Sequence, residues 1–243
     1  MVQLLLTGAT GFVGSEVLQK CLRHPAVRHI VVLTRKALPL EAYGKQRTKV
    51  TEIVHDDFEK YPDGLMQKLA ALDVDSCIWC LGGKATQFPD LETAQRVGIS
   101  YTHSAAEAIA AHLGPGLAKR GKKFRFVYCS AWGAEPDQTR YLWVQADTRR
   151  IKGAAEKGLF DLADAPGTQG FEAFALRPGT VLAKERGADA VLVEAVMASV
   201  KVDRLAKMLV DVAIEGMPSS EGRRVMENTE ILGDDWAAIN TVS

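Results

Sequence analysis

Short apolar runs alternate along the chain with longer amphipathic stretches. The runs are rich in β-branched residues and continuously apolar, a pattern typical of strands that are buried on both faces of a parallel sheet. We predict a weak strand near Val225 and Met226 and six clear ones, at Val2 to Leu6, Ile30 to Leu33, Val50 to Val54, Cys77 to Leu81, Phe124 to Cys129 and Phe171 to Leu176.

The stretches between these runs carry apolar residues at helical spacing. A helix is predicted to begin near Phe12, and further helices at Gly64 to Leu72, Leu91 to His112, Tyr141 to Ala163 and Val202 to Ile214. Regular alternation of strands and helices predicts an α/β fold, a Rossmann-type doubly wound parallel sheet with right-handed crossovers.

The chain has 243 residues and no repeat or linker that would divide it. This length suits one domain, so we expect a single domain over residues 1–243. The 64 residues after Gly179 (243 − 179) are too few for an independent substrate domain. We therefore expect residues 180–243 to form a short helical cap over the substrate cleft.

Charge and hydropathy narrow the range of partners. Thirty basic and thirty acidic residues cancel, so no overall field favours nucleic acid. The N-terminus lacks the features of a signal peptide, and no apolar stretch is long enough for a membrane span. We expect a cytoplasmic protein with a small-molecule partner, and the oligomeric state stays open.

Four cysteines raise the question of thiol or metal chemistry. Cys77 and Cys80 form a C-x-x-C pattern, but residues three apart in a strand point to opposite faces of the sheet. Cys21 and Cys129 are interpreted as small buried apolar residues. We expect neither a disulfide nor a metal site.

A glycine-rich motif, TGATGFVG, follows the first predicted strand and opens the first helix. Gly8, Gly11 and Gly14 allow a tight turn, a close approach of a pyrophosphate to the backbone, and close packing of helix on strand. The helix N-terminus adds free amide groups for an anion. The motif predicts a dinucleotide site, to which Thr10, Phe12 and Val13 also contribute.

The end of the second strand favours NADP over NAD. NAD-binding proteins usually carry an acidic residue about 20 positions after the glycines. Arg35 occupies that position here, between Thr34 and Lys36. A guanidinium fork matches a 2′-phosphate and cannot accept a hydrogen bond from a ribose hydroxyl. The alternative is an arginine that is simply solvated at a strand end.

Later strand ends should complete the cofactor site, because ligands of such sheets bind at the carboxyl ends of the strands. Asp57 and Phe58 follow the third strand, where an adenine edge would be read. Leu81, Gly82 and Gly83 follow the fourth strand and would let the backbone pass close to the cofactor.

Six motifs together resemble a known family: TGATGFVG, LTR, CLGG, CSAWGA, YLWVQ and RPG. From about Val2 to Asn228 the chain is similar to the atypical short-chain dehydrogenase/reductases, and among them to the Tat-interacting or metastasis-suppressor-like proteins and their fungal mitochondrial relatives. Such proteins often bear a nucleoside-diphosphate-sugar epimerase label, but this chain lacks the long C-terminal region of true epimerases. Mitochondrial association is implied by the resemblance alone.

The resemblance also implies catalytic residues. In that family a tyrosine exchanges the proton of the substrate oxygen, helped by an upstream serine and by a lysine one helical turn later. Tyr141 matches the tyrosine, and Ser130 matches the serine unless Ala131 holds that position. Gln145 stands where the lysine is expected and brings no charge. Gly98 replaces an acidic or amide residue.

The residues at the far end of the cleft follow the sixth strand. By the same resemblance, Arg177, Pro178 and Gly179 would line the nicotinamide end of the cofactor. Trp132 and Trp143 either wall an apolar substrate pocket or belong to the core.

Three functions fit this pattern. The first is an NADP-dependent oxidoreductase acting on a small carbonyl or alcohol, with Tyr141 as proton donor and Ser130 polarising the oxygen. The second is a non-redox enzyme on the same fold, such as an isomerase, dehydratase or cyclase. The third is an NADPH-sensing regulatory protein. The apparent loss of the lysine keeps the second and third open.

Overall fold

The computed structural model describes residues 1–184, 199–217 and 222–233. Its centre is a sheet of seven parallel strands in the order β3-β2-β1-β4-β5-β6-β9. All seven predicted strands are confirmed. They are β1 (Val2–Thr7), β2 (Val27–Thr34), β3 (Val50–Val54), β4 (Ser76–Trp79), β5 (Phe124–Cys129), β6 (Phe171–Arg177) and β9 (Val225–Glu227).

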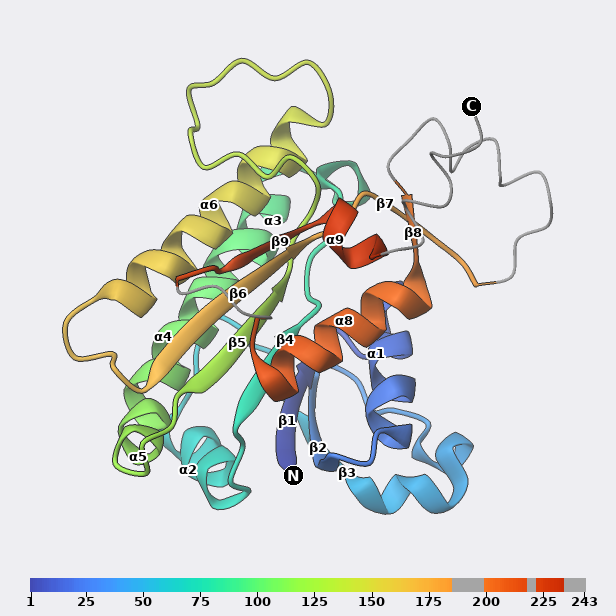
Figure 1. Ribbon diagram of the computed structural model, residues 1–243, viewed down its shortest axis with the longest axis vertical. Coiled ribbons are helices and arrows are strands. Elements are labelled where there is room, and N and C mark those ends of the chain that lie inside the picture. Colours follow the sequence, from blue (N-terminus) through green and yellow to red (C-terminus); the bar gives the residue numbers. More distant parts are fainter. Residues whose placement is uncertain (185–198, 218–221, 234–243) are drawn as a thin grey trace.

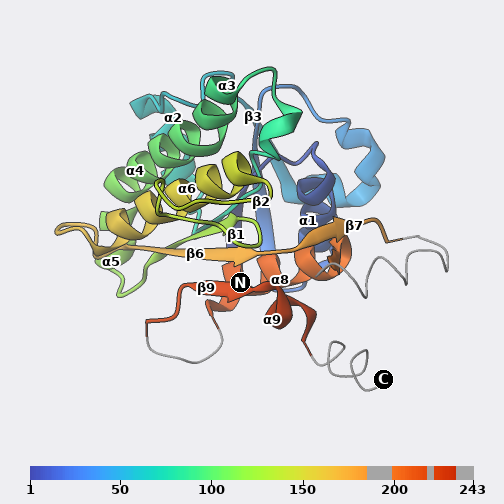
Figure 2. The same cartoon turned by 90° about the horizontal axis from the view of Figure 1, so that it is seen from above.

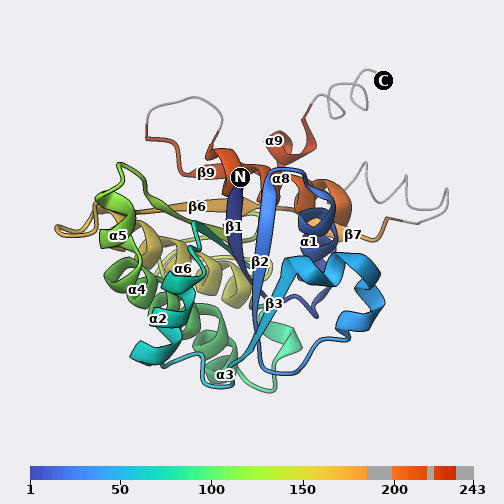
Figure 3. The same ribbon diagram turned by 90° about the horizontal axis from the view of Figure 1, so that it is seen from below.

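Helices cover both faces of the sheet. On one face, α1 (Phe12–Arg23) and α8 (Val202–Glu215) pack against Leu4 and Leu6 of β1. On the other, α2 (Asp63–Ala71), α4 (Tyr101–His112) and α6 (Ala146–Asp164) pack against Leu5. Figure 2 and Figure 3 show these two layers from opposite ends of the strands. The doubly wound architecture predicted from the sequence is confirmed.

The order of the strands reverses at β1, which lies between β2 and β4. In doubly wound sheets ligands bind outside the carboxyl ends of the strands at such a reversal. In Figure 1 this edge faces upward, and the yellow-green loop that joins β5 to α6 projects above it. The topology thus places the glycine motif, which follows β1, at the expected binding edge.

The predicted helix at 91–112 is divided into three parts. α3 (Leu91–Gln95) leads into a π-helix, η3 (Arg96–Ser100), and then into α4. Gly98 lies in the π-helix, where an added Cβ would collide with the Ile151 side chain of α6. Glycine at this position is therefore explained by close packing of two helices.

The predicted helix at 141–163 begins five residues late, at Ala146. Gln145 has φ 50° and ψ 36°, a left-handed conformation that a helix cannot include. Tyr141 to Gln145 are therefore the end of a loop, and the spacing of one helical turn expected between Tyr141 and Gln145 does not exist.

The described residues after Gly179 contribute to the sheet and to its layers. A second, two-stranded parallel sheet joins β7 (Thr180–Leu182) to β8 (Ser199–Lys201). Short elements that periodicity did not predict are η1 (Leu40–Lys49), η2 (Ala85–Gln87), α5 (Gly114–Ala118) and α9 (Asn228–Leu232). Within the described ranges, no helix has the length and apolar character needed to cross a membrane.

Candidate active site

A large cavity opens at the carboxyl ends of the strands. Its volume is about 1090 Å³, at the upper end of the roughly 300–1,000 Å³ of ligand pockets. Five residues predicted to form the cleft all line it: Gly82, Gly83, Ser130, Tyr141 and Gly179. These residues, which follow different strands, thus lie together at this edge of the sheet.

The glycine motif shapes one end of the cavity. Gly8 has φ +70°, and a Cβ on it would lie 2.6 Å from the carbonyl oxygen of Cys80. A Cβ on Gly14 would collide with the Gly8 carbonyl, so this glycine is needed for α1 to pack on the turn. The loop and the helix can approach each other only because both positions lack a side chain.

The N-terminus of α1 is open toward this cavity. Gly11 is the N-cap residue, no side chain caps the helix, and its first turn holds no acidic residue. Gly11, Phe12, Val13 and Gly14 line the cavity. Uncapped amide groups at a helix N-terminus attract anions, so these residues fit a pyrophosphate.

The predicted adenine and 2′-phosphate residues do not line this cavity. Arg35 is exposed just after β2, where the Thr34 hydroxyl donates to the Lys36 carbonyl (2.9 Å). Asp57 is only partly exposed, and hydrogen bonding from the Glu59 amide holds the pKa of its carboxyl below the ordinary range. The Phe58 ring is buried in the core, stacked on Tyr101, so only its backbone is available to a ligand.

The end of β5 differs from the expectation for Ser130. This side chain is buried, and its hydroxyl donates to Glu156 at 2.5 Å. Glu156 also accepts hydrogen bonds from Arg177. Because a serine has one hydroxyl proton, Ser130 in this arrangement can accept a hydrogen bond from a ligand but cannot donate one to a carbonyl oxygen.

The segment after β6 is only partly as predicted. Pro178 and Gly179 line the cavity, and the Gly179 amide donates to Asn228 Oδ1 at 2.7 Å. Arg177 does not line it, because its guanidinium pairs with Glu156 and Glu227. Hydrogen bonds to Glu156 raise the pKa of Arg177. Arg177 therefore joins the end of β6 to α6 and β9 and does not face the cavity.

Tyr141 and Gln145 both line the cavity from the loop before α6. The Tyr141 side chain is 71% exposed and meets the Trp143 ring edge-on at 5.0 Å. No helix relates the two residues, so the match of YLWVQ to the tyrosine-lysine pattern does not describe this backbone. Their catalytic roles stay predictions.

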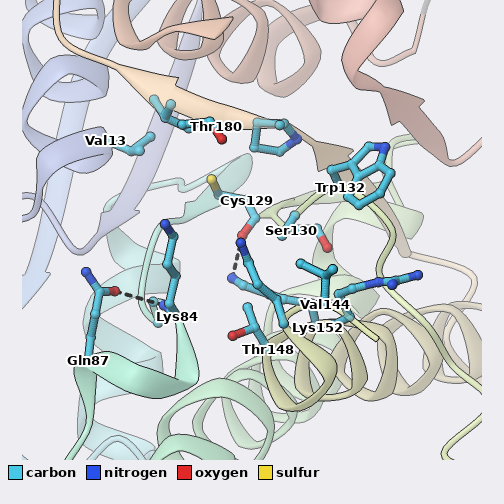
Figure 4. A pocket seen from close by; sticks show the side chains of 18 of the residues that line it. Val13, Lys84, Gln87, Cys129, Ser130, Trp132, Val144, Thr148, Lys152 and Thr180 are labelled. Carbon is cyan, nitrogen blue, oxygen red and sulfur yellow. Dashed lines mark hydrogen bonds between the residues drawn. The ribbon is translucent and has the colours of Figure 1, made fainter. Parts of the chain in front are cut away.

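A lysine that sequence reasoning did not select projects into the same cavity. Lys152 lies on α6 with only 6% of its surface exposed, and its Nζ donates to the Cys129 carbonyl at 2.8 Å. Its ammonium lies over the Tyr128 ring, 4.7 Å from the centroid. Figure 4 shows Lys152 at the cavity with Cys129, Thr148 and Lys84 around it.

Opposing influences act on the pKa of Lys152. Burial acts to lower the pKa of this lysine, but the neighbouring Tyr128 and cysteine groups outweigh it and raise the pKa above its ordinary value. No Asp or Glu is among the described residues that line the cavity. The cavity thus holds a buried lysine, and its described lining residues include no carboxylate.

Thr148 lies one helical turn before Lys152, at the position where the family pattern has tyrosine. It is buried, and its hydroxyl accepts a hydrogen bond from the Ala85 amide at 2.9 Å. The available tyrosine, Tyr141, precedes the lysine by eleven residues (152 − 141). One turn before this buried lysine the chain thus carries a threonine, and its hydroxyl is already engaged by the Ala85 amide.

A signal for Lys152 existed in the sequence. On α6 the buried positions include Thr148, Ile151, Lys152, Ala155 and Leu159, so this lysine falls on the apolar side of the helix. Lysine is almost never fully buried without a partner or a role. Placing the helix start at Tyr141 concealed this, because it assigned the lysine position to Gln145.

Two cysteines also reach the cavity. Trp79 and Tyr128 are register partners, so the residues that follow them, Cys80 and Cys129, lie side by side. A hydrogen bond from the Cys80 thiol lowers the pKa of Cys129, and Lys152 acts in the same direction. Cys80 and Cys77 pack in opposite core layers, as predicted, whereas Cys129 is a cavity residue and not only a core one.

By sequence, the chain matches one family model and one known relative, each over part of its length. The family model described as male sterility protein, an NAD-binding model, matches residues 6–108. The mitochondrial protein fmp52 of Aspergillus fumigatus is 36% identical over 61 residues. That match covers 25% of this chain and 26% of the fungal protein, so it concerns only about a quarter of either.

Comparisons by structure cover nearly the whole chain. Yeast methylglyoxal/isovaleraldehyde reductase Gre2, in complex with NADPH, is similar over 93% of this chain and 77% of its own, with a TM-score of 0.68 and 15% identity. The chain has the short-chain dehydrogenase/reductase fold. A Saccharomyces cerevisiae short-chain dehydrogenase/reductase, YIR035C, covers 94% of this chain and 96% of its own (TM-score 0.67, 14% identity).

Sugar-nucleotide enzymes also share this short-chain dehydrogenase/reductase fold. The dTDP-glucose 4,6-dehydratase DesIV of Streptomyces venezuelae covers 97% of this chain and 83% of its own, with a TM-score of 0.65 and 14% identity. The predicted resemblance to the atypical short-chain dehydrogenase/reductases is confirmed.

Proposed function

We propose that this protein is an NADP-dependent oxidoreductase of the atypical short-chain dehydrogenase/reductase type that acts on a small carbonyl or alcohol. The observation that carries the proposal is Lys152, a buried ammonium in the cavity that also contains the open N-terminus of α1. Similar folds are named as complexes with NADPH or NAD, which supports a nicotinamide cofactor.

Different residues of the chain would bind different parts of the cofactor. The amides of Phe12, Val13 and Gly14 would hold the pyrophosphate, and Arg35 would pair with a 2′-phosphate. The second assignment favours NADP over NAD, because a guanidinium is always charged and presents several donors to a phosphate. When bound, NADPH would supply a hydride to the substrate.

The polar residues of the cavity would handle the substrate oxygen. Lys152 would stabilise the negative charge that develops on that oxygen, because fixed positive charge in a site shielded from water acts strongly. Tyr141 would donate the proton from the loop before α6. Ser130 is not assigned this role, because its proton is directed at Glu156.

A regulatory function is the second candidate, and one observation favours it. Thr148 stands one turn before Lys152, where the family carries the proton-donating tyrosine, and a threonine hydroxyl is a far weaker acid than a phenol. If Tyr141 does not serve in its place, the protein would bind NADPH without turnover. We also propose a cytoplasmic location; the name of the fungal relative keeps mitochondrial association open.

The test is an assay of NADPH oxidation with a panel of aldehydes and ketones, followed at the absorbance of the reduced nicotinamide. Lys152→Met is expected to lower turnover about 10²- to 10⁴-fold, the usual contribution of a positioned proton-transfer or charged group. Tyr141→Phe is expected to lower it by a similar factor.

Lys157→Met is the matched control. It removes a lysine from the same helix, at an exposed position where the ammonium pairs with Asp161, and should leave turnover unchanged. Full activity of both Lys152→Met and Tyr141→Phe would refute the proposed mechanism. Calorimetric binding of NADPH without reduction of any carbonyl would favour the regulatory candidate.

A further inference from the structure

The mouth of the cavity gathers apolar side chains that are open to solvent. Eight large apolar residues are exposed in the part of the chain that the structure describes, and five of them line this cavity. The five are Phe12, Trp132, Tyr141, Trp143 and Val144. Contiguous exposed apolar surface of this kind marks a binding site.

Four of these residues are aromatic, and three of the four lie on the loop between β5 and α6. Trp132, Tyr141 and Trp143 are all more than half exposed, and Trp143 is 87% exposed. Tyr141 and Trp143 meet at right angles, so their rings form two walls of a corner. Aromatic walls favour flat, apolar ligands, which they contact face-on or edge-on. We name Trp132, Tyr141 and Trp143 the aromatic rim.

The charged residues beside the rim are all basic. Lys84, Arg140, Arg149 and Lys152 line the cavity, and no acidic residue does so within the described ranges. The chain as a whole has as many acidic as basic residues, so this is a local bias. Arg140 is neutralised by Glu135 at 2.9 Å. Lys84 and Arg149 form no ion pair with any described residue.

Arg149 is held ready for an anion next to the rim. Its guanidinium lies over the Trp132 ring, 5.4 Å from the centroid, and its Nε donates to the Gly133 carbonyl at 2.7 Å. Gly133 has φ +65°, and a Cβ there would lie 2.8 Å from Arg149 Nε. The arginine is thus fixed by one nitrogen, while its two Nη groups remain able to bind a carboxylate.

We infer that the substrate of this cavity is a flat aromatic carbonyl compound that carries a carboxylate or another anionic group. Its ring would lie within the aromatic rim, and its anionic group would pair with Arg149. The inference rests on the proposed function, because it names the substrate class of the same site. The pyrophosphate site at α1 belongs to the opposite side of the cavity, so cofactor binding leaves Arg149 without an anion.

The experiment compares three ketones by calorimetry in the presence of saturating NADP⁺. The first, 4-acetylbenzoate, is flat and anionic; 4-acetylbenzamide is flat and neutral; 4-acetylcyclohexanecarboxylate is anionic but not flat. We expect 4-acetylbenzoate to bind about tenfold tighter than either of the others, as expected for one charge-assisted hydrogen-bonded contact.

Two variants separate the roles of charge and ring. Arg149→Gln should abolish the preference for the benzoate over the benzamide, whereas Trp143→Ala should weaken both flat ketones by a similar factor. Arg28→Gln, which removes an exposed arginine outside the cavity, is the control for net charge and should change neither affinity.

Failure of this inference is distinguishable from failure of the proposed function. If NADP⁺ does not bind, the proposed function fails before any ketone is added. If NADPH-dependent reduction occurs but the benzoate and benzamide bind equally well, only the substrate class is refuted. Self-association that Trp143→Ala removes, without binding of any ketone, would assign the rim to a second copy of the chain and overturn the inference.

Discussion

The two ends of the cavity are built from different parts of the polypeptide. At the β1–α1 end, backbone conformation does the work: glycines permit the turn, and uncapped amides of α1 face the cavity. At the β5–α6 end, the chemistry depends on side chains from a loop and from one face of a helix. The first end follows from eight consecutive residues, whereas the second depends on where α6 begins.

This difference explains why the sequence was informative at one end and misleading at the other. A glycine motif specifies its own geometry, because each glycine is required by a neighbour within the same turn. The direction in which a helical lysine points depends on where the helix begins, and this start is not marked by the lysine itself. Gln145 ends the loop in a left-handed conformation, and this one backbone state moves the start of the helix beyond Tyr141.

Arg35 tests whether the first end is in fact independent of side chains. It lies just after β2, outside the lining of the cavity, and its proposed role depends on its side chain. Arg35→Glu should weaken NADPH binding about a hundredfold and leave NADH binding nearly unchanged, because it removes a charge-assisted pair and adds a like charge. Calorimetric titration of both cofactors measures the change.

The control for Arg35 is its exposed neighbour Lys36. Lys36→Glu makes the same change of charge one residue away and should affect NADPH binding much less. Equal affinities of the wild-type protein for NADPH and NADH would contradict the assignment of Arg35 and return the choice of cofactor to residues we have not identified.

Gly98 tests how the second end is positioned. An added methyl group would collide with Ile151, the residue before Lys152. Gly98→Ala should therefore lower the free energy of unfolding by about 1–3 kcal/mol, the usual cost of overpacking a well-packed contact. Urea titration measures it.

Gly116→Ala is the matched control, because a Cβ there meets nothing within 4 Å. Gly116 lies in a helix, so this change should leave the stability equal or slightly higher. If Gly98→Ala is as stable as Gly116→Ala, the close packing of α6 on the π-helix does not determine where Lys152 sits.

Most of the fold could be predicted from periodicity alone. Apolar runs located all seven strands. The signal is continuous for the central strands, which are buried on both faces, and weakest for the short edge strand β9. The pair β7 and β8, with three residues in each strand, was not predicted. The division of the 91–112 helix depends on a contact with α6, which is distant in sequence, and local spacing cannot report it.

The site could be predicted where it depends on the order of the strands, but not where it depends on contacts between individual side chains. The strand-end residues Gly82, Gly83 and Gly179 could be placed because the fold brings the carboxyl ends of the strands together. Ser130 could be placed at the cavity, but not its bond to Glu156, which is 26 residues away. Lys152 was missed because a motif match outweighed the helical pattern around it.

A change at Gln145 distinguishes two interpretations of the β5–α6 end of the cavity, in which the charge near the substrate belongs either at residue 145 or at Lys152. If Gln145 held the position of the family's lysine, Gln145→Lys would restore a missing charge beside Tyr141 and increase turnover. The structure instead brings Lys152 into the cavity, and we propose that this lysine supplies the charge. We therefore expect Gln145→Lys to change turnover by no more than about twofold and to leave its pH profile unshifted. The measurement is a pH series of turnover with one carbonyl substrate, and Gln145→Met, similar in length but neutral, is the control. A tenfold gain in Gln145→Lys alone, with the profile displaced toward lower pH, would show that Lys152 does not supply the charge and that the loop tyrosine works with residue 145.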